Sequence, residues 1–267
     1  MTVQQRNNVK VSGNGPATLF FAHGFGCDQH MWRLVQPAYA KRYRTVLFDL
    51  VGWGMSDLSA YDKKKYDTLQ GYADDLQDIA EEFAQGPCVL VGHSVSAMIG
   101  MLADIKAPGL FRAHAMIGPS PCYVNDGDYV GGFERKDIDS LLETLESNYL
   151  GWSSNMAPAI MGAPNRPELG VELTNSFCRT DPEIAKQFAR VTFLSDNRAD
   201  LPKLATPTLI LQSSDDLIAP VTVGQYLQRV LPHGTLKIID NVGHCPHLSA
   251  PGASTDAINA FLVEQGL

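Results

Sequence analysis

The chain has 267 residues, of which 45% are hydrophobic and 19% charged, and these values are typical of a globular protein with one sizeable core. Its formal net charge of -8 excludes a nucleic-acid partner or an anionic membrane surface, because both need clustered Lys and Arg. The one basic run, Lys63–Lys65, lies between Asp62 and Asp67 and is expected to be a solvated loop.

Short apolar runs rich in β-branched or aromatic residues recur along the chain and predict buried parallel strands. Helical patterns lie between these runs, so the sequence predicts βαβ units and a mostly parallel sheet flanked by helices, an α/β protein. The expected strands are Thr18–Ala22, Thr45–Asp49, Cys88–Val91, His114–Ile117, Pro207–Gln212 and Leu236–Asp240, and the helices between or after them are Leu69–Phe83, Val95–Ala103, Val221–Leu231 and Ala253–Val263.

The alternation stops between Pro121 and about Arg198, where amphipathic helical patterns follow one another without a strand. The sequence therefore predicts a single domain over 1–267, with a core of 1–120 and 199–267 and a helical insertion of about 121–198 that rests on the sheet. Four prolines punctuate this insertion, which is consistent with several short helices and tight joints. The expected helices are Asp137–Tyr149, Asn155–Met161, Glu168–Phe177 and Glu183–Leu194, and the prolines are Pro158, Pro164, Pro167 and Pro182.

A strand that runs through Gly92-His93-Ser94 into a helix of small residues predicts a nucleophile elbow. Such a turn holds the serine in a strained conformation and needs small neighbours. The second glycine of the G-x-S-x-G pattern is Ser96 here, which is still small. The alternative interpretation of Ser94 is a helix N-cap at an ordinary βα turn. A serine nucleophile excludes dehalogenase or epoxide-hydrolase chemistry, which uses a carboxylate at this position.

Two further residues complete a catalytic triad in the order Ser, Asp, His that is typical of this sheet edge. Asp216 follows the strand at 207–212, and His244 follows the strand at 236–240. We expect His244 to act as the general base and Asp216 to orient it. Asp215 is the rival carboxylate, with a turn or cap as its alternative role, and His247 is interpreted as a packing or hydrogen-bonding histidine.

The glycine-rich turn His23-Gly24-Phe25-Gly26 after the first expected strand predicts one half of an oxyanion hole. The expected donors are the backbone N–H groups of Phe25 and Val95. An ordinary glycine turn is the alternative interpretation. His93, beside the nucleophile, is expected to shape the pocket wall.

The five cysteines are odd in number and form no C-x-x-C pair, which favours reduced thiols over a disulfide framework or a zinc site. No metal and no cofactor are expected. There is no apolar signal segment and no run of about 18 apolar residues, so the sequence predicts a cytoplasmic protein without a membrane span.

Long stretches of the chain resemble the RsbQ-like family of α/β-hydrolases, which includes a bacterial stress-response regulator and is related to the plant strigolactone and karrikin receptors. The matching stretches are AHGFGCDQHMW from Ala22, LFDLVGWGMSDL from Leu47, GHSVSAMIGMLA from Gly92, GPSPCYVND from Gly118, GGFE from Gly131, FLSDNR from Phe193 and GHCPHLSAP from Gly243. The G-x-S-V-S form of the elbow is common in this family.

The resemblance implies a four-helix lid over a mostly apolar pocket whose floor is the triad. Lining candidates are Phe25, His93, Tyr123, Phe133, Trp152, Met156 and Phe193, although lid-to-core packing is the alternative role of the aromatic ones and of Met156. Two functions remain open. One is a serine hydrolase for a small hydrophobic ester or lactone, and the other is a ligand-gated signalling receptor or adaptor for a PAS-domain phosphatase with little turnover. A neighbouring gene for such a phosphatase would favour signalling.

Overall fold

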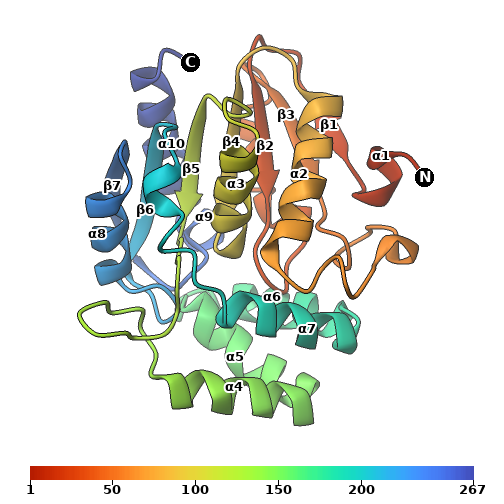
Figure 1. The fold of residues 1–267 in the computed structure, drawn as a ribbon, viewed down its shortest axis with the longest axis vertical. Coiled ribbons are helices and arrows are strands. Elements are labelled where there is room, and N and C mark those ends of the chain that lie inside the picture. Colours follow the sequence, from red (N-terminus) through yellow and green to blue (C-terminus); the bar gives the residue numbers. More distant parts are fainter.

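The computed structural model describes residues 1–267, and its centre is a seven-stranded sheet with the strand order β1-β3-β2-β4-β5-β6-β7 (Figure 1). All neighbouring strands are parallel except β1 and β3, which are antiparallel. The strands are β1 Lys10–Ser12, β2 Thr18–Ala22, β3 Arg44–Phe48, β4 Cys88–His93, β5 Ala113–Ile117, β6 Thr208–Asp215 and β7 Gly234–Val242.

Burial of the strands follows their place in the sheet. Every residue of the central strands β2, β4 and β5 is buried, in agreement with their continuous apolar sequences. The edge strand β1 is exposed throughout and has only three residues, a run too short for its polar–apolar alternation to predict a strand. The mostly parallel α/β fold and the six expected strands are confirmed.

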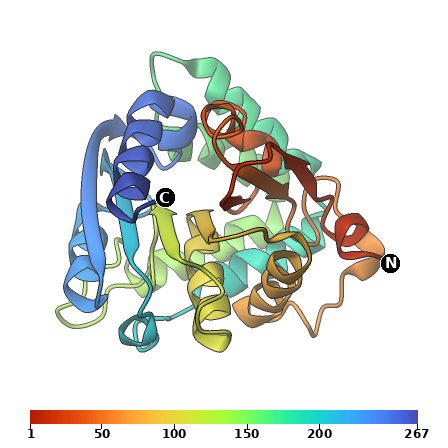
Figure 2. The same cartoon turned by 90° about the horizontal axis from the view of Figure 1, so that it is seen from above.

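Helices cover both faces of the sheet (Figure 2). Helices α2, α3 and α8 lie on one face. Helix α10 lies on the other face, together with the segment that holds the 3-10 turns Gln29–Trp32 and Gln36–Ala38. No helix is both long and apolar enough to cross a membrane. The bounds are α1 Val3–Arg6, α2 Leu69–Phe83, α3 Val95–Lys106, α8 Val221–Val230, α9 Pro246–Ser249 and α10 Pro251–Glu264, and the 3-10 turns are Gln29–Trp32, Gln36–Ala38, Leu58–Ala60 and Leu201–Lys203.

Four helices follow one another between β5 and β6 and lie below the sheet in Figure 1, at the carboxyl ends of its parallel strands. We call α4–α7 the helical layer. Its residues Leu142, Trp152, Leu173, Phe177 and Phe188 are buried and belong to the same hydrophobic core as the sheet. The bounds are α4 Arg135–Ser147, α5 Tyr149–Met161, α6 Pro167–Arg179 and α7 Pro182–Phe193.

One expectation about this layer is wrong. Helix α5 begins at Tyr149 rather than near Asn155, because the side chain of Asn148 accepts a hydrogen bond from the Gly151 N–H and starts the helix there. Pro158 lies inside α5 and does not end it. The helix continues through the proline because α5 packs closely on α6. The packing is close at this point, since a Cβ atom on Gly170 of α6 would lie 3.3 Å from the Pro158 backbone.

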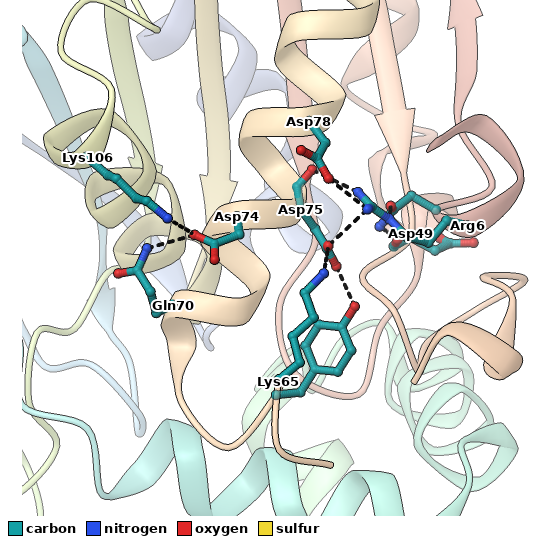
Figure 3. A network of polar contacts seen from close by, with 10 residues as sticks. Arg6, Asp49, Lys65, Gln70, Asp74, Asp75, Asp78 and Lys106 are labelled. Carbon is teal, nitrogen blue, oxygen red and sulfur yellow. Dashed lines mark hydrogen bonds and ion pairs between the residues drawn. The ribbon is translucent and has the colours of Figure 1, made fainter. Parts of the chain in front are cut away.

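A buried carboxylate joins the N-terminus to helix α2 (Figure 3). Asp75 is bound by Lys65 at 2.5 Å, by the Tyr66 hydroxyl at 2.7 Å and by Arg6 at 3.3 Å. Arg6 also binds Asp78 at 2.8 Å. The basic run is therefore only partly a solvated loop, because its last lysine neutralises a carboxylate that is 2% exposed.

Replacement of Asp75 by Ala is expected to lower the free energy of unfolding by about 2–4 kcal/mol, because it leaves a buried hydroxyl and two cations without their shared partner. Urea unfolding measures this change. The matched control is Asp74→Ala on the same helix, whose carboxylate is exposed and pairs with the exposed Lys106. An exposed pair contributes about 0–1 kcal/mol, so equal losses in the two variants would contradict the prediction.

Candidate active site

Ser94 lies between the end of β4 and the start of α3, with φ 56° and ψ −123°. This left-handed region disfavours residues with a side chain. The turn also brings backbone segments close together, since a side chain on Gly92 would lie 2.9 Å from the Ser96 carbonyl oxygen. The small residues of the sequence motif are therefore required by the geometry of the turn.

The structure brings Ser94, His244 and Asp216 together, although Ser94 and His244 are 150 positions apart. The Ser94 Oγ lies 2.8 Å from His244 Nε2, and the His244 Nδ1 lies 2.8 Å from the Asp216 carboxylate. A carboxylate only accepts, so Nδ1 carries the proton and Nε2 is the acceptor that faces the serine. The three residues are 5%, 3% and 6% exposed, respectively.

Backbone groups fix the acid and the histidine. The second carboxylate oxygen of Asp216 accepts from the N–H groups of Ile218 at 2.8 Å and Ala219 at 3.1 Å. The N–H of His244 donates to the carbonyl of Ile160 in α5 at 2.8 Å. Gly118 closes the other side, because a side chain there would lie 3.0 Å from the imidazole. Gly118, which follows the buried strand β5, was not among the predicted site residues.

The rival residues lie elsewhere. Asp215 is exposed to solvent and makes no contact with the imidazole of His244. His247 is fully buried and packs against the rings of Trp32 and His93, with centroids 4.8 Å and 4.5 Å away. A second buried Asp–His pair, between Asp104 and His114, has no hydroxyl on its far side. Only His244 joins an acid to a serine.

The two expected oxyanion donors come from different parts of the chain. Val95 is the first residue of α3, so its N–H has no acceptor within the helix. The N–H of Phe25 donates to no protein acceptor. Both groups flank the turn that carries Ser94, since the neighbouring Gly24 lies against the Ser94 side chain. The arrangement can receive a negatively charged oxygen.

Ser96 connects these two segments. Its hydroxyl donates to the carbonyl of His23 at 2.5 Å, from the first turn of α3 to the loop after β2. His23 is held in turn by the Leu50 N–H, which donates to its Nε2 at 3.0 Å. Burial lowers the pKa of His23, which keeps the ring neutral and able to accept this bond. The serine that replaces the second glycine of the motif thus has a structural role of its own.

A small apolar cavity lies directly above the triad. The space in which the centre of a water molecule can move is about 30 Å³, enough for about two waters. Besides the triad residues Ser94 and His244, its walls come from the core loops and from α5–α7. The other lining residues are Phe25, Cys27, His93, Tyr123, Ile160, Leu173, Phe177, Thr192, Phe193, Ile218 and Cys245.

Of the predicted pocket residues, Phe25, His93, Tyr123 and Phe193 line this cavity. Trp152 does not, because its ring lies behind Phe177, stacked on it at 5.8 Å. Met156 and the outer side of Trp152 lie on the face of α5 that points away from the triad, and they line a separate groove at the protein surface. Phe133 lies in a loop after Tyr123 and pairs with Val124.

Burial keeps four titratable side chains around the cavity neutral. Burial raises the pKa of Tyr123 to about 12, so its hydroxyl stays protonated. Burial also raises the pKa of the Cys27 and Cys245 thiols, and it lowers the pKa of His93 well below its usual value. The only carboxylate in the site is Asp216. A neutral, apolar ligand therefore fits the chemistry of these walls.

A mostly parallel sheet that presents serine, aspartate and histidine in this chain order at its carboxyl edge is typical of hydrolases. The chain belongs to the alpha/beta hydrolase family, whose model matches residues 19–257. The expectation of a hydrolase with this fold is thereby confirmed.

Individual relatives cover nearly the whole chain. It is 41% identical over 250 residues to karrikin insensitive 2 receptor CA of Petunia hybrida, with 93% of each chain covered. It is 40% identical over 245 residues to strigolactone esterase D14 of Arabidopsis thaliana, with 91% of each chain covered. Among solved structures, a hydrolase from Oleispira antarctica is 42% identical with a TM-score of 0.93, covering 98% of this chain and 96% of that one.

The left-handed backbone at Ser94 predicts a difference between two inactive variants. Glycine adopts this conformation without strain, whereas alanine does not, so Ser94→Gly is expected to be more stable than Ser94→Ala by about 1 kcal/mol after the greater flexibility of unfolded glycine is subtracted. Urea unfolding compares the two, which both lack the hydroxyl. A glycine variant that is less stable than the alanine variant would show that the turn is unstrained.

Proposed function

We propose that this chain hydrolyses a small hydrophobic ester or lactone, with Ser94 as nucleophile, His244 as general base and Asp216 as the orienting acid. The observation that carries the proposal is the continuous hydrogen-bond chain among these three side chains at the floor of an apolar cavity. The membership in a hydrolase family supports it.

The first half of the reaction forms an acyl-enzyme. As the Ser94 oxygen attacks the carbonyl carbon, His244 Nε2 takes its proton, and Asp216 stabilises the resulting imidazolium. The carbonyl oxygen becomes negative and faces the N–H groups of Phe25 and Val95. The imidazolium then gives its proton to the departing alkoxide, which in a lactone stays attached to the acyl group.

The second half restores the enzyme. His244 takes a proton from a water molecule, whose oxygen attacks the acyl carbon and reforms the oxyanion. The imidazolium then returns the proton to the Ser94 oxygen as the acid product leaves. One water is consumed, and the net products are the carboxylic acid and the alcohol, or the hydroxy acid from a lactone.

The cavity walls restrict the substrate. Apart from the triad no charged side chain lines the cavity, so a substrate with a free charge would be desolvated without a partner. The limited space above Ser94 favours substrates whose acyl group is short and apolar. We propose that the helical layer, residues about 121–198, acts as a lid of the single domain and opens to admit them.

Hydrolysis of p-nitrophenyl acetate by purified variants tests the proposal. Ser94→Ala and His244→Ala are each expected to lower kcat by about 10⁴-fold or more, because the nucleophile or its base is lost. Asp216→Asn is expected to lower kcat by about 10³–10⁴-fold, because the amide favours the wrong imidazole tautomer.

Asp215→Asn is the matched control, since it makes the same change at the exposed neighbouring carboxylate. It should retain the wild-type rate within about twofold, as expected for a surface substitution. If wild type and Ser94→Ala hydrolyse the ester equally slowly while both bind it, the chain is a binding protein and the proposed mechanism is wrong.

We propose further that the chain is RsbQ-like and that its hydrolysis serves signalling through a PAS-domain phosphatase in a stress response. The motif stretches around Ala22, Gly92, Gly118 and Gly243 support this assignment. The alternative is a receptor with little turnover, which the naming of a Petunia relative as a receptor supports. Signalling that persists in Ser94→Ala would favour that receptor role, and signalling that is lost would favour the hydrolase.

Ser96 is proposed as a positioning residue for the oxyanion donors. Ser96→Ala removes its bond to His23 and frees the loop of Phe25 to shift relative to Val95. We expect kcat to fall by about 10-fold while KM changes by less than about twofold, because the oxyanion exists only after attack. Steady-state kinetics measure both.

The matched control for this variant is Ser153→Ala. The Ser153 hydroxyl is also buried and donates to a backbone carbonyl, that of Tyr149, but it lies within α5. It should leave kcat nearly unchanged. A kcat for Ser96→Ala equal to that of the control would show that the link between the two segments does not position the donors.

A further inference from the structure

Three side chains that are common metal ligands lie together beside the cavity: His93, Cys245 and His247. One ligand atom from each lies within 4.8 Å of the other two, and the three residues are 2%, 1% and 0% exposed. An ion placed centrally among three atoms at these spacings would lie about 2.8 Å or less from each atom. None of the three takes part in the hydrogen bonds of the proposed triad.

Three of the four imidazole nitrogens in this cluster lack hydrogen-bond partners. The Nε2–H of His93 donates to the His244 carbonyl at 2.9 Å, which leaves Nδ1 with a free lone pair and no hydrogen bond. Neither ring nitrogen of the fully buried His247 has a hydrogen-bond partner. Buried polar atoms are almost always satisfied, so these orphaned atoms point to a ligand that they bind.

We propose that His93, Cys245 and His247 form a site for a Zn²⁺ ion and that its occupation inhibits hydrolysis. Two imidazoles and one thiolate are ligands that Zn²⁺ accepts, at distances of about 2.0–2.3 Å. From their present spacing, each ligand atom has to move inward by no more than about 0.5–0.8 Å.

Protonation states agree with such a site. Burial lowers the pKa of His247 to about 3, so its ring is neutral and offers a lone pair. Burial raises the pKa of Cys245, so the thiol is protonated until a metal binds. Zinc binding forms the sulfur–zinc bond and releases this proton to solvent.

The place of the cluster explains both access and inhibition. His93 and Cys245 line the cavity, so an ion that enters the cavity reaches them without crossing the core. The ring of His93 lies 5.0 Å from that of His244, between centroids. A zinc ion with one thiolate keeps a net positive charge, which opposes formation of the His244 imidazolium. This consequence rests on the proposed function, whereas the site itself does not.

Titration of the metal-free protein with Co²⁺, a spectroscopic probe for zinc sites, tests the site without turnover. We expect one equivalent to bind and to give the near-ultraviolet absorption of a cobalt–thiolate bond. In Cys245→Ala this band should disappear and the affinity should fall at least 10-fold. Cys27→Ala is the matched control, because the Cys27 thiol lines the same cavity but lies outside the cluster.

Zn²⁺ should inhibit hydrolysis of p-nitrophenyl acetate by wild type and Cys27→Ala at least 10-fold more strongly than hydrolysis by Cys245→Ala, each relative to its own rate without metal. A cobalt band that is absent in wild type, persists in Cys245→Ala or is lost in Cys27→Ala would overturn the site. Inactivity of the wild-type protein toward esters would overturn the proposed function and leave the cobalt titration to decide on the site alone.

Discussion

The backbone conformation of Ser94 is the constraint from which most of the site follows. At φ 56° the serine stands out of the turn between β4 and α3, with its hydroxyl directed at His244. The same turn leaves no space for a side chain at Gly92 and opens α3 with the N–H of Val95 unpaired. The buried sheet supplies the packing that holds this strained turn, because β4 lies at its centre.

The helical layer gives these groups a dry environment. Residues of α5, α6 and α7 close the cavity above the triad, and the Ile160 carbonyl of α5 also fixes the backbone of His244. Excluding water strengthens the electrostatic interactions among the charged groups that form during the proposed reaction. The layer and the sheet therefore depend on each other: each provides part of the surroundings of the same imidazole.

Local sequence patterns predicted the elements whose residues are buried on all sides, such as β2 and β4, and the positions of Ser94, Asp216 and His244 at strand ends. They failed where tertiary contacts decide. The rotation of α5 places Ile160 on the cavity and Met156 on the surface, and no pattern within the helix distinguishes the two. The sequence indicated only that Cys27 and Cys245 are reduced thiols, and it is the fold that brings both to one cavity.

The small volume above Ser94 limits when a substrate can bind. Space for about two waters is too small for an ester, so the proposed hydrolysis would require the helical layer to open first. On the proposed function, turnover would begin from that open form, and the observed affinity would be the intrinsic affinity reduced by the population of that form. A smaller side chain at Phe188, which stacks on Phe25 but does not line the cavity, would thus alter binding without contacting the substrate.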